Sequence, residues 1–101
     1  MDAQERFEER IRALRAGFIM GLPDRLATMR AALRRDDRAT LQHEAHRLAG
    51  TGVSYGLPEL TTWGRDVERK LKSGATLAAL DADLDTLSDF IARVVPQSAA
   101  G

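Results

Sequence analysis

The sequence predicts an all-α protein: an antiparallel, up-down four-helix bundle with an additional N-terminal helix. Apolar residues recur at intervals of three and four along almost the whole chain, which is the period of an amphipathic helix. No segment of useful length alternates between apolar and polar residues as a half-buried strand would. The breaks between the helical segments are short, and short links favour neighbouring helices that run in opposite directions.

An apolar stripe and a proline define the first two expected helices. The first stripe is formed by Phe7, Ile11, Leu14 and Phe18. Its spacings of four, three and four predict a helix over residues 2–21, which we expect to pack across one end of the bundle. Pro23 lacks a backbone donor and disfavours helix just before it, so the first helix should break at Gly21. A second helix then covers residues 22–35.

Capping residues and turn signals place the other three helices. Asp37 is a suitable N-cap for a third helix that runs to about Val53. Pro58 suits the first turn of a fourth helix, and Gly74 is expected to end it. Thr76 can then cap the fifth helix.

The fifth helix carries the most regular seam of the chain, with apolar residues at spacings of three and four from Leu77 to Val94. Pro96 is expected to end this helix, because proline has no backbone N–H to continue it. A chain of 101 residues can form one core but not two. We therefore expect a single helical-bundle domain over residues 1–95 and an unstructured tail over residues 96–101.

The composition is that of an ordinary globular protein, with 44% hydrophobic and 30% charged residues. A formal net charge of zero argues against nucleic-acid binding, which normally requires a basic excess. The charges are nevertheless segregated. Residues 25–47 contain six arginines and three carboxylates, whereas residues 75–101 contain four aspartates and one arginine. The basic segment favours an acidic protein partner.

The expected location is the cytoplasm. The chain has no cysteine, which excludes disulfides and thiolate chemistry. No apolar run approaches the roughly 18 residues that span a membrane, and residues 1–5 do not resemble a signal peptide. We expect a monomer that contacts neither membrane nor nucleic acid.

The surroundings of His46 give the strongest indication of function. On a helical wheel of about 100° per residue, Leu41, Ala45 and Leu48 share one apolar face. His46 lies about 140° from Leu41, on a face without long side chains. Its neighbours on that face are Ala49, Gly50 and Val53. An open imidazole on such a face indicates histidine chemistry carried out with a partner protein.

The residues that follow His46 keep a specific spacing. They are Leu48 at two positions, Gly50 at four, Gly56 at ten, Leu60 at fourteen and Glu68 at twenty-two. A lone His-x-Leu would be uninformative. On an all-helical chain, however, the combination resembles the histidine-containing phosphotransfer (HPt) domain of bacterial phosphorelays, over about residues 15–95.

The resemblance implies that His46 accepts a phosphoryl group from a receiver-domain aspartate, or from a sensor or hybrid histidine kinase, and passes it to another response regulator. A neutral imidazole is a competent nucleophile near pH 7. Mg²⁺ is expected on the partner receiver domain, so this chain itself needs no cofactor. Partner docking is expected on the face around His46, which comprises Gln42, His43, Arg47, Ala49, Gly50 and Val53.

This interpretation makes the chain a phosphoryl carrier and not an enzyme. It has neither a glycine-rich phosphate loop nor a kinase signature with which to bind ATP. We also expect no second titratable group placed to work with His46 as acid or base. Met1 and the complete N-terminal helix favour a free-standing protein over a fragment of a hybrid kinase.

One position departs from the family pattern. The family usually carries a lysine, which helps to hold the phosphoryl oxygens, where this sequence has Ala49. Arg47 is the nearest replacement in sequence, but its wheel position points partly away from the histidine. Two alternatives therefore stay open: a degenerate HPt-like domain that binds receivers without phosphotransfer, and a helical adaptor or dimerisation module in which His46 is incidental.

Three other side chains have a functional and a plain interpretation. His43 and His46 could share a metal, but two ligands are too few for a stable zinc site, so we expect no metal and a solvated His43. Glu68 either orients its neighbours or is a simple surface carboxylate. Trp63 lies in the apolar stripe of the fourth helix, so we expect it in the core and not at an interface.

Overall fold

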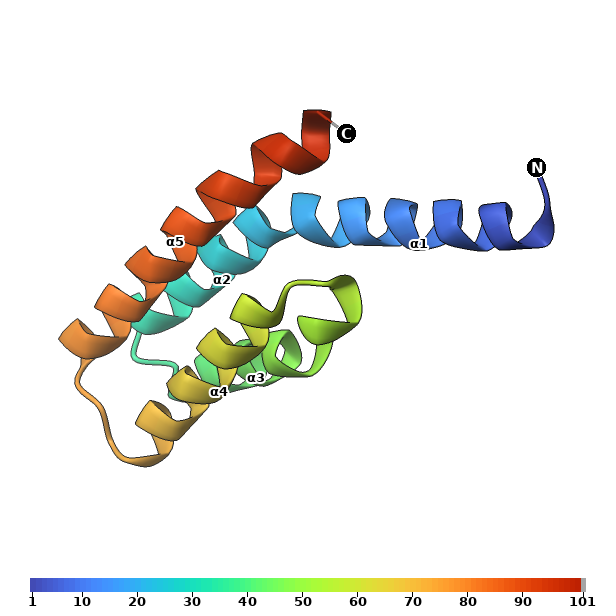
Figure 1. The fold of residues 1–101 in the computed structure, drawn as a ribbon. Coiled ribbons are helices and arrows are strands. Elements are labelled where there is room, and N and C mark those ends of the chain that lie inside the picture. Colours follow the sequence, from blue (N-terminus) through green and yellow to red (C-terminus); the bar gives the residue numbers. More distant parts are fainter. Residues whose placement is uncertain (101) are drawn as a thin grey trace.

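The computed structural model describes residues 1–100, with side chains as far as Pro96. Its regular structure over that range is helical throughout, which confirms the predicted all-α class. The elements are α1 (Ala3–Met20), α2 (Leu22–Arg34), α3 (Arg38–Thr51), the short 3₁₀ helix η1 (Val53–Tyr55), α4 (Pro58–Lys72) and α5 (Leu77–Ala100). Figure 1 shows α2, α3, α4 and α5 gathered together, while α1 extends away from them. None of the described helices is long and apolar enough to cross a membrane.

The predicted capping residues occupy the expected places. The carboxylate of Asp37 accepts a hydrogen bond from the backbone N–H of Thr40 at 3.1 Å, and thereby caps the N-terminus of α3. The hydroxyl of Thr76 accepts from the backbone N–H of Ala79 at 3.1 Å at the start of α5. Gly74 follows α4 with a φ of 78°, a left-handed conformation that glycine adopts without steric cost.

The end of α3 differs from the prediction, because the helix stops at Thr51 and not at Val53. Gly52 packs against the next segment so closely that an added Cβ would lie 2.8 Å from the carbonyl oxygen of Leu57. The N–H of Val53 donates to the hydroxyl of Thr61 at 3.0 Å. This tertiary contact replaces the next intrahelical bond, and the chain continues as η1.

The expected unstructured tail is wrong for residues 96–100, because α5 continues through Pro96 to Ala100. A proline inside a helix removes one backbone hydrogen bond and crowds the carbonyl four residues before it, which kinks some helices without ending them. Gly101 lies outside the described residues.

The core forms where the predicted stripes of α2 to α5 meet. Its largest fully buried side chains are Ile19, Leu22, Met29, Leu41, Leu48, Leu60, Val67, Leu80, Leu84 and Leu87. The closest approach joins α3 and α4, where a Cβ on Gly64 would lie 2.5 Å from the carbonyl oxygen of Ala45. Because the apolar face of α3 is pressed against the bundle in this way, its opposite face is left in solvent.

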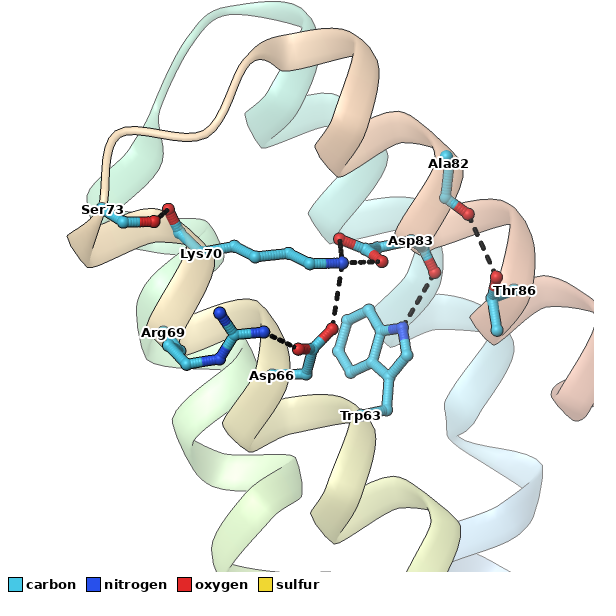
Figure 2. A network of polar contacts seen from close by, with 8 residues as sticks. All are labelled: Trp63, Asp66, Arg69, Lys70, Ser73, Ala82, Asp83 and Thr86. Carbon is cyan, nitrogen blue, oxygen red and sulfur yellow. Dashed lines mark hydrogen bonds and ion pairs between the residues drawn. The ribbon is translucent and has the colours of Figure 1, made fainter.

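A polar network joins α4 to α5 at the edge of the core (Figure 2). The Nζ atom of Lys70 lies 2.9 Å from Oδ1 of Asp83 and 3.0 Å from Oδ2 of Asp66. Arg69 also pairs with Asp66. The indole N–H of Trp63 donates to the backbone carbonyl of Asp83 at 2.8 Å, and its ring, predicted to lie in the core, is half-buried and packs against the edge of the core. This network fixes α4, and with it the side of α4 that faces α3.

The first helix does not pack across one end of the bundle, which corrects that expectation. Among the described side chains, only those of its C-terminal part anchor it, through the buried Ile19, the stacking of Phe18 on Tyr55 and a hydrogen bond from Nε of Arg15 to the carbonyl oxygen of Tyr55. Gly21, the single residue between α1 and α2, has φ −83° and ψ −11°, which are close to helical values. The chain therefore runs on from α1 into α2 without folding back.

Candidate functional site

His46 projects from the outer face of α3, as the helical wheel predicts. Its side chain is 74% exposed, whereas Leu41, Ala45 and Leu48 on the opposite face are fully buried. The imidazole is therefore accessible to a second protein, and its backbone is held by one of the best-packed segments of the bundle.

Glu68 of α4 lies directly beside this imidazole. Its carboxylate oxygens are 3.2 Å and 3.3 Å from Nδ1 of His46, and its side chain is only 16% exposed. The expectation that no second titratable group accompanies His46 is therefore wrong. The pattern of α3 alone could not show this contact, because it depends on how α3 and α4 pack through Gly64. The only signal in the sequence was the spacing of 22 positions between His46 and Glu68, which resembles the family pattern.

The contact favours one of the two ring nitrogens of His46 for chemistry with a partner. A carboxylate accepts a hydrogen bond from Nδ1–H, so it favours the tautomer with the proton on Nδ1. The lone pair of Nε2 is then available to an electrophile. A carboxylate in this position also stabilises positive charge that develops on the ring.

Gln42 and His43 are brought together with His46. These three side chains, with Ala39 and Glu68, line a shallow surface depression. Gln42 and His43 are both exposed, in accord with the expected solvation of His43.

The other four predicted docking residues lie at different depths. Arg47 and Gly50 are exposed on α3, and a Cβ added to Gly50 would meet no atom within 4 Å. Val53 is 64% exposed but belongs to η1. Ala49 is only half-buried and turns toward α4, where its Cβ would lie 3.0 Å from a Cβ on Gly64.

Three cations of α4 lie next to the site and were not singled out from the sequence. Arg65, Arg69 and Lys72 line a second depression together with Glu68, which thus borders both depressions. Arg69 is paired with Asp66, whereas Arg65 and Lys72 form no ion pair with the side chains described through residue 96. Arg65 and Lys72 are three and four positions from Glu68, which places them on the same side of α4, and this spacing could have identified them.

The sequence matches the Hpt domain family over residues 13–96, which is most of the chain. The chain therefore belongs to the Hpt domain family. Domains of this family are phosphocarrier modules of two-component signalling and interact with receiver domains and histidine kinases. No curated protein and no solved structure matches the chain.

Proposed function

We propose that this chain is a phosphorelay intermediate whose phosphorylated residue is His46. It accepts the phosphoryl group from a receiver-domain aspartate or a kinase and passes it to another response regulator. The observation that carries this proposal is the exposed imidazole of His46, with Nδ1 held 3.2 Å from the mostly buried carboxylate of Glu68, in an Hpt domain.

The transfer step needs only one nucleophilic atom from this chain. The Nε2 lone pair of His46 attacks the phosphorus of the aspartyl phosphate, a P–N bond forms, and the P–O bond to the aspartate breaks. The aspartate leaves as a carboxylate, and the Nδ1 proton stays on the ring. Glu68 accepts a hydrogen bond from that proton and stabilises the cationic ring of the product. The reverse step passes the group to the next aspartate.

The docking surface that we propose is the open face of α3 and the start of η1. Around His46 it comprises the exposed residues Gln42, His43, Arg47, Gly50 and Val53, with the half-buried Ala49 at its edge beside α4. The open space over Gly50 supports this assignment, because a partner must bring its aspartate and Mg²⁺ to within bonding distance of the imidazole.

We propose that α2, α3, α4 and α5 act as an up-down four-helix scaffold for this face. Consecutive helices reverse direction in Figure 1, and α3 packs most closely on α4, which supplies Glu68. In this arrangement the chain has the role of a phosphoryl carrier and does not bind ATP.

Ala49 supports one other candidate, a domain that docks on receivers without accepting phosphate. The residue is half-buried against α4 and provides no charge for the phosphoryl oxygens. The two functions share the docking face and differ only in the covalent step.

Transfer from a phosphorylated receiver distinguishes the two candidates. Receiver domains labelled on their aspartate should pass an acid-labile, alkali-stable phosphate to the wild-type chain, and mass spectrometry should locate it on His46. The adduct should be absent from His46→Gln and present in His43→Gln, the matched control on the same helix. Receivers that bind the chain but never transfer phosphate to it would establish the docking-only function instead.

A further inference from the structure

Arg65 is an exposed cation of α4 that borders the site of His46. It lines the same depression as Glu68, whose carboxylate contacts the imidazole. Among the side chains described through residue 96, the guanidinium of Arg65 forms no ion pair, whereas that of Arg69 in the same depression pairs with Asp66. The charge of Arg65 is therefore available to an anion that arrives at this surface.

The packing of α3 on α4 places Arg65 beside the turn that carries His46. A Cβ on Gly64 would lie 2.5 Å from the carbonyl oxygen of Ala45 and 3.0 Å from the Cβ of Ala49. These two alanines flank His46 in the sequence, and Arg65 directly follows Gly64. The side chain of Arg65 therefore begins where the two helices are closest, and Ala49 has no atom beyond its Cβ to stand between Arg65 and the imidazole.

Phosphorylation of His46 creates a need for a cation at this place. A phosphoryl group brings negative charge and acceptor oxygens. The carboxylate of Glu68 is already 3.2 Å from Nδ1 of the same ring, and like charges at close range are unfavourable. A guanidinium meets this need well, because its planar set of donors matches phosphate oxygens and it stays charged at any working pH.

The other cations of α4 are placed less well. Arg69 is already paired with Asp66. Lys72 lies about two helical turns from Gly64, so it begins farther from the closest approach of the two helices than Arg65 does. Its ammonium is also a point charge, which lacks the fixed geometry with which a guanidinium binds two phosphoryl oxygens.

We infer that Arg65 binds the phosphoryl oxygens of phosphorylated His46 and stabilises that state. This inference rests on the proposed phosphorylation of His46. Arg65 donates hydrogen bonds to the oxygens, while the P–N bond, the ring proton and the charge of the guanidinium stay unchanged. In this way α4 supplies the positive charge that Ala49 does not supply from α3.

The phosphotransfer equilibrium of the full chain with one phosphorylated receiver tests this inference. In Arg65→Gln the ratio of phosphorylated chain to phosphorylated receiver should fall about two- to fivefold, the range expected for an exposed ion pair. Arg65→Lys keeps the charge and should retain most of the wild-type ratio. Arg69→Gln removes a cation that is already paired and should leave the ratio unchanged. A wild-type ratio in Arg65→Gln, or a fall in Lys72→Gln alone, would overturn the inference.

A second measurement, made without the receiver present, separates binding of phosphate from binding of the partner. Titration of the phosphorylated chain by ³¹P NMR gives the pKa of the phosphoryl group. A guanidinium in contact with this group favours its more charged form, so the pKa should be higher in Arg65→Gln than in the wild type. An unchanged pKa would contradict the inference even if the equilibrium moved, because Arg65 would then act on the receiver.

The two measurements also separate this inference from the proposed function. Phosphate on His46 with the same equilibrium and the same pKa in wild type and Arg65→Gln would refute the role of Arg65 alone. A wild-type chain that accepts no phosphate would refute the proposed function, and the role of Arg65 with it. Thermal unfolding should be equal in wild type and Arg65→Gln, because the side chain of Arg65 is exposed.

Discussion

Nδ1 of His46 lies 3.2 Å from Oε2 of Glu68, and this contact joins α3 to α4 across 22 positions of the sequence. The two side chains differ strongly in exposure, with 74% for the histidine and 16% for the glutamate. The carboxylate is therefore fixed by the bundle and the imidazole is free to meet a partner. Such a pair favours a hydrogen bond from the ring nitrogen that faces the carboxylate and leaves the other nitrogen open to a partner.

Removing the carboxylate should slow phosphotransfer and leave folding nearly unchanged. In Glu68→Ala we expect the rate of transfer to His46 to fall about tenfold, the equivalent of about 1.4 kcal/mol for one hydrogen bond to a charged group at a partly exposed site. Glu68→Gln keeps the size of the side chain, and its transfer rate should lie between those of the wild type and Glu68→Ala. Single-turnover transfer gives the rates, and ¹⁵N shifts of the imidazole report the tautomer. Equal rates in all three proteins would exclude a positioning role for Glu68.

Gly50→Arg should block transfer without unfolding the domain. The added side chain enters open space, since a Cβ at this position meets nothing within 4 Å. Stability should change little, because Gly50 lies in the last turn of α3, next to its final residue Thr51, where a glycine is less unfavourable than in a helix interior. Gly50→Ala, with no bulk to obstruct a partner, serves as the control and should transfer normally. Wild-type transfer by Gly50→Arg would place the docking face elsewhere.

Gly64→Ala should destabilise the domain, in contrast to Gly50→Arg. Its Cβ would lie 2.5 Å from the carbonyl oxygen of Ala45. The helices α3 and α4 must then move apart, and overpacking of this kind costs about 1–3 kcal/mol. The separation should also lengthen the contact between His46 and Glu68. Urea unfolding measures the loss, and Gly50→Ala provides the same chemical change without a clash. A Gly64→Ala protein as stable as the wild type would show that this close approach is not needed.

The sequence predicted features that lie within one helix better than features between helices. The positions of His46 and of the buried seam of α5 follow from apolar spacing alone, and Asp37 and Thr76 follow from capping preferences. The contact with Glu68 does not, because it depends on the register of α3 against α4. Likewise, the stripe of α1 shows that a face must be covered but cannot show by what.

The network of Lys70 should make stability depend on pH at both extremes. Hydrogen bonds from Lys70 and Arg69 lower the pKa of Asp66 from 3.8. Asp66 therefore stabilises the folded state above that pH, and this stabilisation is lost as the pH falls through the lowered pKa. Hydrogen bonds to Asp83 and Asp66 raise the pKa of Lys70 from 10.5, so that contribution is present below this pH and is lost as the pH rises further.

Urea unfolding as a function of pH tests this dependence. The free energy of unfolding should change little from about pH 5 to pH 9 through this network and decline outside that range. Lys70→Met should reduce both declines, whereas Lys72→Met, which changes an exposed lysine of the same helix, should keep them. Identical pH profiles for wild type and Lys70→Met would mean that other groups control stability at the extremes.

Ala49→Lys should shift the phosphotransfer equilibrium toward phosphorylated His46. An ammonium about 4 Å from the phosphoryl oxygens would attract each unit of charge by roughly 4 kcal/mol at an effective dielectric constant near 20. Solvent screening and loss of side-chain entropy reduce the net effect to about 0–1 kcal/mol, so we expect a shift of up to about fivefold. Ala39→Lys, two helical turns from His46, adds the same charge about 10 Å away and should have a smaller effect, because that distance equals the screening length. The equilibrium with one receiver, measured for the three proteins, decides the outcome. If Ala49→Lys produces no shift, another group already neutralises the phosphoryl charge. Arg65 is the candidate, because it lies beside Glu68 and has no ion pair among the described side chains. Arg65→Ala should then move the equilibrium away from phosphorylated His46.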